Sequence, residues 1–306
     1  MKILFFGRGV VSTQYAWAFE KAGHIVEFYV RKGRKETYGH SVQVEIWDAR
    51  KSLKGKFVNE DWKITLKEEV NPNHDYDLIF VSVNTEQVSG AVDYLKNRVG
   101  NATVLFFNNF WQDPKTEVAP IPLNQVVFGF PGAGGGIENN KLRGGFLKTV
   151  FIEGSRQGVE TRIEEVKQLF WGAGFKVITL KDMRSWLWNH FAINAAMEVE
   201  LVKCGSFRNM MESPQSLSNI GLNLREIVPV LKAKGAKVDL ITNLFAYLPH
   251  KFLGFLLGKV VFAPKSLSRQ FMLYNNSKPG YALQQVFNTA QKFNVSTPRL
   301  KAAFKI

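Results

Sequence analysis

Hydrophobic residues follow two different spacings in the first 181 residues. Short apolar runs are typical of buried strands, and they lie at 1–6, 25–30, 77–83, 103–107, 126–130 and 176–180. Apolar residues at helical spacing lie between them, at 11–22, 86–98 and 159–170, and the first of these segments predicts an amphipathic helix. The alternation predicts an α/β fold with a Rossmann-like domain over residues 1–181.

Three further segments of this domain have weaker patterns. Alternation at 42–46 and 62–66 predicts a meander, and the run at 149–154 predicts an edge or hairpin strand. The glycine-rich stretch 132–136 resembles a phosphate loop but lacks its Gly-Lys-Ser/Thr ending. We expect a mobile loop or an irregular connection there.

Beyond residue 181 the pattern is helical almost throughout. It predicts a long helix from about 182 to 204. Gly or Pro interrupts the pattern at 205, 213–214, 248–249, 263–264 and 278–280. Residues 182–306 are therefore expected to form an all-helical second domain that binds substrate or mediates dimerisation.

The turn after the first strand has the spacing of a dinucleotide-binding turn. Gly7 would permit a tight turn, and Gly9 would let a pyrophosphate approach the backbone at the positive end of the next helix. The third position of the G-x-G-x-x-G pattern is the small residue Ser12. The cofactor-binding residues predicted here are Gly7, Arg8, Gly9, Val10, Val11 and Ser12. A flavodoxin-like turn that binds no dinucleotide is the alternative.

Basic residues stand where a dinucleotide fold places the adenosine ribose. The chain reads Arg31-Lys32-Gly33-Arg34-Lys35 there, with no acid before Glu36. NAD-binding proteins usually place an acid at this position, so the cations favour a 2′-phosphate and therefore NADP(H). A solvated basic turn is the alternative.

Asparagines follow two further strands of the predicted sheet. Asn84 ends the run 77–83, and Asn108 and Asn109 end the run 103–107. Ligands of such sheets bind beyond the carboxyl ends of the strands, so these side chains are candidates for cofactor or substrate contacts. Asparagine is also common in turns for local reasons.

One helix of the second domain carries a polar stripe. His190, Asn194 and Glu198 are spaced i, i+4 and i+8, so they share one face of the predicted helix 182–204. Apolar neighbours flank them, which favours a polar cleft. An ordinary solvated face is the alternative.

Composition excludes several classes of function. The formal charge is +14, from 40 Lys and Arg against 26 Asp and Glu, but the cations are scattered and predict no nucleic-acid partner. The single cysteine, Cys204, allows no intrachain disulfide, which fits a cytoplasmic protein. The five histidines lack metal-ligand spacing, so no metal site is expected.

Hydropathy predicts neither a signal peptide nor stable membrane insertion. The apolar stretch 253–262 comes closest to a membrane segment. We interpret it as a core-packing helix end, with a membrane-surface contact as the minor alternative.

The chain resembles the ketopantoate reductase (2-dehydropantoate 2-reductase) family. The resemblance covers the Gly7/Gly9 turn, Arg31, the Asn after strand 103–107, the helix with Trp188, His190 and Asn194, and Pro298. It implies an N-terminal NADP-binding Rossmann domain and a C-terminal helical domain like that of 6-phosphogluconate dehydrogenase. It further implies cytoplasmic reduction of a 2-oxo acid with NADPH, in pantothenate biosynthesis, by a monomer or homodimer.

The resemblance also assigns site residues, with departures. His190 stands where the family has a catalytic Lys, Glu198 where it has a second Asn, and Lys278 where it has a substrate-binding Glu. The implied catalytic residues are His190, Asn194 and Lys278. The implied substrate-binding residues are Asn109, Asn194, Glu198, Ser266 and Lys278, and Arg31, Asn84 and Asn109 complete the cofactor site.

Three interpretations follow from these departures. The first is an NADPH-dependent reductase with a changed, more anionic small-molecule substrate, in which His190, with a pKa near ~6.5, is the general acid and Glu198 orients it. The second is a catalytically silent NADP(H)-binding sensor or scaffold. The third is a working ketopantoate reductase with compensating residues.

Overall fold

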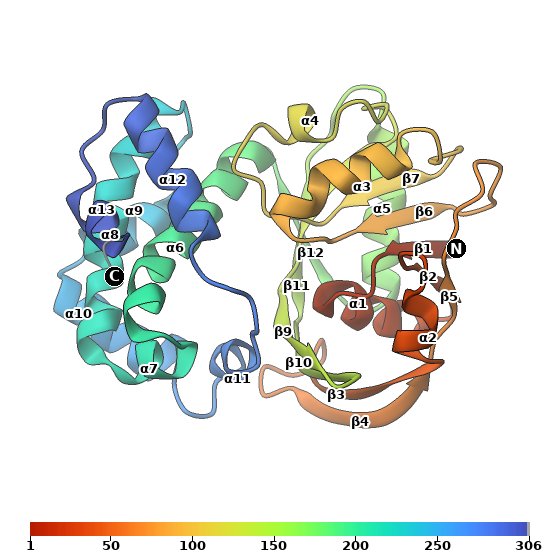
Figure 1. Cartoon of the computed structure of the whole chain (residues 1–306), viewed down its shortest axis with the longest axis horizontal. Helices are drawn as coiled ribbons and strands as arrows, with labels where there is room; N and C mark the ends of the chain where they lie inside the picture. The colour runs from red at the N-terminus through yellow and green to blue at the C-terminus, as the bar shows by residue number, and fades with distance from the viewer. Residues whose placement is uncertain (305–306) are drawn as a thin grey trace. The chain divides into compact units, whose positions relative to one another are not determined.

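The computed structural model describes residues 1–304 and divides into two compact units. The α/β unit comprises Met1–Asn108 and Gln112–Met183, and the helical unit comprises Asn109–Trp111 and the residues from Arg184 onward (Figure 1). The segment Asn109–Trp111 groups with the helices because Trp111 is buried among them and its Nε1 donates a hydrogen bond to Thr289 Oγ1 at 2.8 Å.

An eight-stranded sheet forms the centre of the α/β unit. Its strand order is β12-β11-β8-β7-β6-β1-β2-β5, and every neighbouring pair is parallel except β11 with β8. The strands are β1 (Lys2–Phe6), β2 (Ile25–Tyr29), β5 (Leu66–Lys67), β6 (Leu78–Val81), β7 (Thr103–Phe106), β8 (Val126–Phe130), β11 (Thr149–Glu153) and β12 (Lys176–Leu180). The expectation that 149–154 is an edge or hairpin strand is wrong, because β12 pairs along its outer side and forms the edge.

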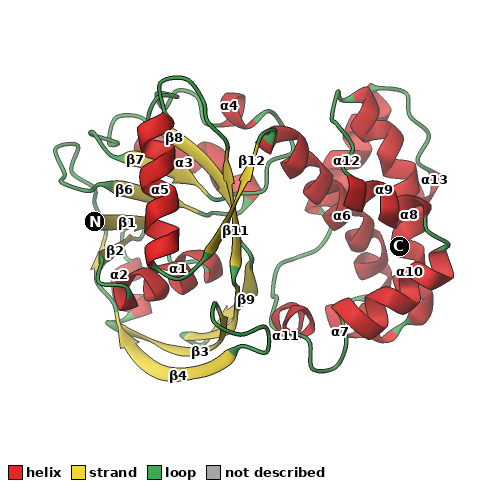
Figure 2. Cartoon of the chain, turned by 180° about the vertical axis from the view of Figure 1, so that it is seen from behind, coloured by secondary structure: helices red, strands yellow, loops and turns green. Residues whose placement is uncertain are grey.

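Helices cover both faces of this sheet, as Figure 2 shows. Alternate residues of β1 point to opposite faces. Ile3 and Phe5 join the core under α1 (Val10–Lys21) and α5 (Glu160–Gly172), whereas the ring of Phe6 lies 5.7 Å from that of Tyr94 in α3 (Val88–Leu95). Short helices lie in the connections: α2 (Arg34–Tyr38), η1 (Thr85–Gln87) and α4 (Pro114–Glu117).

A second, four-stranded sheet packs on the outer side of α1. Its order is β4-β3-β10-β9, with β3 (Ser41–Ala49), β4 (Lys56–Lys63), β9 (Ala133–Glu138) and β10 (Lys141–Leu147). The indole nitrogens of Trp17 and Trp62 donate to Glu60 and Glu20, each at 2.6 Å, and connect α1 to β4. All of α1 from Ser12 to Phe19 is buried between the two sheets, so the prediction of an amphipathic helix is wrong.

The glycine stretch 132–136 forms most of strand β9, so the prediction of a loop is also wrong. Gly135 lies opposite Gly144 in β10, and a Cβ on either residue would overlap the carbonyl oxygen of the facing strand. Gln14 of α1 donates to Gly134 O at 3.0 Å. Glycine is depleted in ordinary strands, and here it permits a close approach of backbones.

The helical unit is built around α6 (Met183–Cys204) and α8 (Pro214–Ala233). The other helices are α7 (Phe207–Glu212), α9 (Leu240–Tyr247), α10 (His250–Leu256), η2 (Leu257–Val261), α11 (Leu267–Leu273), α12 (Tyr281–Lys292) and α13 (Pro298–Ala303). Every break predicted from Gly or Pro falls between two of these helices. Two other breaks, at 234–239 and 293–297, were not predicted, although Gly235 with φ +85° lies in the first of them.

Within residues 1–304, no single helix is both long and apolar enough to cross a bilayer. One pair of helices, Leu240–Tyr247 with His250–Val261, meets the length and hydropathy criteria together but is bent by 118°.

Candidate functional site

The Gly7 turn joins β1 to α1 and has the geometry of an anion site. Gly7 has φ +93°, a left-handed conformation that favours glycine, and its N–H donates to Tyr29 O at 2.9 Å. Gly9 is the N-cap of α1 and supplies no capping side chain, and the first turn contains no acid. The amides at this helix start are therefore left for a ligand, and the helix dipole favours a negative one.

Arg8 and Ser12 fix the turn against its surroundings. Arg8 is 8% exposed, its Nη1 donates to Asn140 Oδ1 at 2.6 Å, and its guanidinium lies 4.4 Å from the centre of the Tyr38 ring. Burial lowers the pKa of Arg8. The hydroxyls of Ser12 and Ser82 lie 2.7 Å apart and join α1 to the end of β6. Val10 and Val11, also predicted as cofactor residues, pack partly buried against the core.

The basic turn after β2 is open to solvent. Arg31, Lys32, Arg34 and Lys35 are all exposed, and Gly33 between them has φ +79°. None of these four side chains forms an ion pair with a residue in the described range 1–304. Their charges are therefore free to meet an anionic ligand group next to the Gly7 turn, because β2 lies beside β1.

The asparagines after β6 and β7 differ in their surroundings. Asn84 is exposed and forms a capping box with Gln87 at the start of η1. This is the local turn role that the sequence analysis gave as the alternative to a ligand contact. Asn108 is buried, and its Nδ2 donates to Val83 O. Its Oδ1 has no hydrogen-bond partner among residues 1–304, so it is the better candidate for a ligand contact at this edge. Asn109 groups with the helical unit.

His190 lies on a half-buried face of α6. Its ring stacks on the ring of Trp186 one turn earlier, with centroids 5.4 Å apart and planes inclined by 10°. Burial lowers the pKa of His190 to about 4, and the nearby carboxylate of Asp239 opposes this shift only in part. The imidazole is therefore neutral near pH 7, whereas the sequence suggested a pKa near ~6.5.

Asn194 and Glu198 continue the same face but have different surroundings. Asn194 is half-buried, and its amide finds no hydrogen-bond partner in the part of the chain that the structure describes. Glu198 Oε2 accepts hydrogen bonds from the N–H groups of Gly280 and Leu283, at 3.1 and 2.9 Å, and so caps α12. Burial raises the pKa of Glu198, and these hydrogen bonds oppose the rise.

Ser266 and Lys278 lie in connections of the helical unit. Ser266 is the N-cap of α11: its Oγ accepts from Arg269 N at 3.2 Å and donates to Val261 O at 2.7 Å. Lys278 is exposed in the connection between α11 and α12. Of the residues predicted in this unit, α6 brings His190, Asn194 and Glu198 onto one face.

Sequence reasoning missed the residues that support His190. Asn189 is 1% exposed and joins α6 to the connection after α8, because its Nδ2 donates to Lys237 O at 2.8 Å and its Oδ1 accepts from Asp239 N at 3.2 Å. This link brings Asp239 close enough to influence His190. The only sequence signal for this role of Asn189 was a polar residue at a core-facing position of the predicted helix.

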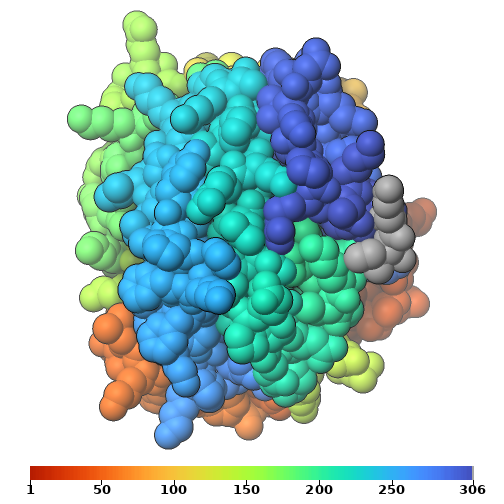
Figure 3. All heavy atoms as spheres, turned by 90° about the vertical axis from the view of Figure 1, so that its left-hand side faces the viewer, coloured from red at the N-terminus to blue at the C-terminus, as the bar shows by residue number. Residues whose placement is uncertain are grey.

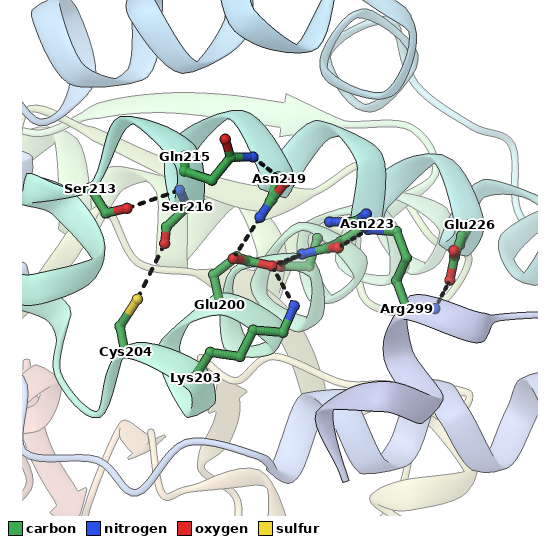
Figure 4. A network of polar contacts seen from close by, with 11 residues as sticks. Glu200, Lys203, Cys204, Ser213, Gln215, Ser216, Asn219, Asn223, Glu226 and Arg299 are labelled. Atoms are coloured by element: carbon green, nitrogen blue, oxygen red, sulfur yellow. Dashed lines mark hydrogen bonds and ion pairs between the residues drawn. The ribbon is translucent and has the colours of Figure 1, made fainter. Parts of the chain in front are cut away.

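A second missed group is the polar network around Glu200 (Figure 4). Glu200 is 2% exposed and accepts hydrogen bonds from Asn223 at 3.0 Å, Asn219 at 3.1 Å and Lys203 at 2.9 Å. These bonds lower the pKa of Glu200 against the effect of burial. Arg299 Nε donates to Asn223 Oδ1 at 2.7 Å and extends the network to α13. The network holds three helices together.

A cavity of about 490 Å³ lies in the α/β unit, away from the predicted site. It is lined by Trp17, Arg50, Phe57 and neighbouring residues of the β3–β4 hairpin. No group of three His, Cys, Asp or Glu side chains able to hold a metal ion occurs within residues 1–304.

The strand order, the glycine turn and the basic turn together define an α/β unit of the Rossmann dinucleotide-binding class, joined in sequence to a helical unit. The predicted resemblance to the ketopantoate reductase family is confirmed over the N-terminal part of the chain. Residues 3–140 match the family model for ketopantoate reductase PanE/ApbA. No curated protein sequence matches the chain significantly.

Solved structures share the fold along the whole chain. D-mandelate dehydrogenase, solved with NADH and anilino(oxo)acetate, has a TM-score of 0.75 at 15% identity, and the match covers 100% of this chain and 96% of the other. A PanE/ApbA family ketopantoate reductase from Ralstonia eutropha JMP134 has a TM-score of 0.72 at 16% identity, covering 99% and 96%. Dimeric ketopantoate reductase from Staphylococcus aureus has a TM-score of 0.64 at 12% identity, covering 99% and 97%. Such identities establish the fold alone.

Proposed function

We propose that this protein is an NADPH-dependent oxidoreductase of the ketopantoate reductase type, reducing a 2-oxo acid to a 2-hydroxy acid with an altered substrate preference. The Gly7 turn carries the proposal, because Gly7 is left-handed and Gly9 leaves the start of α1 uncapped. Two structures of the same fold were solved with NADH, and the family model covers the turn. The bound nicotinamide would supply a hydride to the substrate carbonyl carbon, and a proton would be added to the oxygen.

The basic turn supports NADPH over NADH. Arg31, Lys32, Arg34 and Lys35 are exposed and lie after the strand next to β1. An Arg guanidinium matches the geometry of a phosphate and cannot lose its charge at neutral pH. The buried Asn108 Oδ1 at the end of β7 is a further acceptor for a cofactor donor group.

The substrate side of the proposal rests on α6. His190, neutral near pH 7, would donate a hydrogen bond to the substrate carbonyl oxygen, and Asn194 would orient the substrate with its uncommitted amide. Lys278, exposed where the family has a Glu, would favour a substrate with an additional carboxylate or phosphate. Glu198 would act through the position of α12, since its carboxylate caps that helix.

A catalytically silent NADP(H)-binding protein is the second candidate. The low pKa of His190 favours it, because a neutral imidazole is a weaker proton donor to a developing alkoxide than a charged Lys. The protein would then retain the cofactor-binding residues but would not catalyse reduction of a substrate.

Nucleotide binding followed by turnover separates these candidates. NADPH and NADH are titrated by fluorescence, and a panel of 2-oxo acids that includes dicarboxylic members is then added. Micromolar NADPH binding, at least tenfold weaker NADH binding and oxidation with an anionic 2-oxo acid are expected. Binding without turnover would favour the silent protein, and absence of binding would refute both.

Two variants test the assignments. Arg31→Ala is expected to weaken NADPH binding about tenfold and leave NADH binding unchanged, because it removes one phosphate contact worth about 1.4 kcal/mol. Lys54→Ala, in the exposed turn between β3 and β4, is the matched control. Equal losses for both nucleotides would contradict the 2′-phosphate assignment.

A further inference from the structure

The helical unit exposes a large apolar surface on α9, α10 and η2. Leu240, Ile241, Leu244 and Tyr247 of α9 are 81, 58, 49 and 54% exposed. Phe252 and Phe255 of α10 and Val260 of η2 are 50, 59 and 64% exposed. We call these seven residues the α9–α10 face. Scattered exposed apolar residues are ordinary, but seven large ones on three consecutive helical segments are not.

Helical spacing places these residues on the outer sides of their helices. Leu240, Leu244 and Tyr247 are spaced i, i+4 and i+7, and the opposite side of α9 buries Thr242 and Ala246. In Figure 3 the light-blue atoms of the segment around residue 250 form part of the surface of the helical unit. The apolar residues are therefore presented outward by a folded element.

The support under α10 is rigid. Leu253 and Leu257 are 1 and 4% exposed and belong to the core of the helical unit. Gly254 lies so close to Ser218 of α8 that a Cβ would overlap it, and Gly221 of α8 similarly contacts Leu253. Phe252 and Phe255 point away from this contact and cannot turn inward without a rearrangement of α10 on α8.

The segment that carries this face has charge of one sign, although Arg269 within it pairs with Glu212 of α7 at 2.9 Å. Residues 240–306 contain nine Lys or Arg and no Asp or Glu, so they carry +9 of the formal +14 of the chain. Lys251 of α10 and Lys259 of η2 are spaced four residues before and after the exposed Phe255, and both lysines are exposed and form no ion pair within residues 1–304. The nearest acid in the sequence, Asp239, accepts a hydrogen bond from Thr242 N at 2.7 Å as the cap of α9.

We propose that the α9–α10 face is a peripheral docking site for an anionic lipid bilayer. Large apolar side chains flanked by lysines on the same helix are the arrangement that partitions into the headgroup region while the cations meet acidic headgroups. The helices lie on the surface in this proposal and do not span it, in agreement with the 118° bend between them.

A second copy of this chain is the competing occupant, and the charge disfavours it. A two-fold contact brings the same patch of both chains together. Lys251 and Lys259 of both chains would then lie in one contact, with no acid in residues 240–306 to compensate their charges. A bilayer with acidic headgroups supplies the missing charge.

Vesicle co-sedimentation tests the proposal with the full chain. Vesicles of phosphatidylcholine alone and of an equal mixture with phosphatidylglycerol are compared at low and high salt. Binding to the mixed vesicles is expected, with at least tenfold weaker binding to the neutral ones and a clear loss at high salt, because surface charges are screened. Equal binding to both vesicles, or none to either, would overturn the proposal.

Variants connect binding to the face. Phe252→Ser with Phe255→Ser is expected to weaken binding at least tenfold, since exposed aromatic rings supply the apolar area. Lys251→Gln with Lys259→Gln is expected to weaken binding to the mixed vesicles about fivefold for each lysine. Leu53→Ser with Lys54→Gln is the matched control, because Leu53 is 93% exposed in the α/β unit.

If a second copy of this chain covers the α9–α10 face, self-association is expected in place of vesicle binding. Sedimentation velocity without vesicles measures self-association of the wild-type chain and of the Phe252→Ser, Phe255→Ser variant. A dimer that this variant dissociates, together with no vesicle binding, would assign the face to a second copy and overturn the proposal. Far-UV circular dichroism and the unfolding midpoint check that each variant remains folded, as expected for exposed positions.

Discussion

The Gly7 turn and helix α6 are both candidate sites, but they are built differently. The turn is local: its geometry comes from the φ of Gly7, the uncapped helix start at Gly9 and the adjacent strand β2. On α6, burial lowers the pKa of His190 and Asp239 partly opposes this shift, while Glu198 accepts a hydrogen bond from Gly280, so both depend on segments distant in sequence. A site formed by backbone groups can therefore be predicted from a short sequence motif, whereas a site formed by side chains depends on residues that are distant in sequence.

The largest effect is expected where α6 is most deeply buried. Glu200→Ala leaves Asn223, Asn219 and Lys203 without their shared acceptor, and should lower the free energy of unfolding by about 3 kcal/mol. Urea unfolding measures it. Glu164→Ala, which removes a long ion pair with Lys167 at 3.7 Å and a surface hydrogen bond from Gln168, should change stability by less than about 0.5 kcal/mol. Equal effects of the two substitutions would show that the network has no special role.

Features of the fold could be predicted from the sequence where they depend on residues that are close together in the chain. Most strands of the large sheet and the Gly7 turn could be predicted because runs, spacing and glycine are local signals. Strand β9 could not be predicted, because its glycines usually indicate a loop. Here Gly135 lets the backbones of β9 and β10 approach closely at Gly144. The full burial of α1 also required knowledge of the second sheet.

The candidate site on α6 was predicted as a polar stripe in which Glu198 orients His190, whereas the Glu198 carboxylate accepts hydrogen bonds from Gly280 and Leu283. The spacing of His190, Asn194 and Glu198 indicates a shared face, and nothing in it indicates that Glu198 caps α12. Likewise the pKa of His190 depends on the burial of its side chain, which the local sequence pattern does not predict. Prediction therefore succeeds for the positions of these residues and fails for their chemical state.

A ligand-specific effect is expected at the turn. Gly9→Ser provides a capping hydroxyl that occupies the amides of α1, so NADPH affinity should fall about thirtyfold, or about 2 kcal/mol, while stability is unchanged or slightly higher. A Cβ at Gly9 meets only Ser82 O, at 4.0 Å. Gly90→Ser, in open space on α3, is the control for both measurements. A large loss of stability without loss of affinity would reject the phosphate role.

A pH-dependent effect of about 2 kcal/mol is expected from His190, smaller than the full shift of its pKa implies because the side chain is only half-buried. The unfolded pKa is about 6.5 and the folded pKa about 4, so the unfolded state binds more protons between these values. The contribution is complete above about pH 6.5 and is lost as the pH falls toward 4. His190→Phe keeps the stacking on Trp186 and should remove this part of the acid sensitivity in urea unfolding. His40→Phe, at an exposed position, should retain it.

The smallest effect is expected from the cap that Glu198 provides. Glu198→Ala removes two hydrogen bonds at the start of α12 and should cost about 1 kcal/mol, whereas Glu198→Gln retains an acceptor and should cost less. Burial raises the pKa of Glu198, so the folded state favours its protonated form and the stability from this group falls as pH rises through the folded pKa. The stability of the wild type relative to Glu198→Gln should therefore decline from acid to neutral pH. If Glu198→Ala instead leaves stability unchanged and abolishes turnover, Glu198 belongs to the reacting site, and the contrast between the turn and α6 becomes weaker.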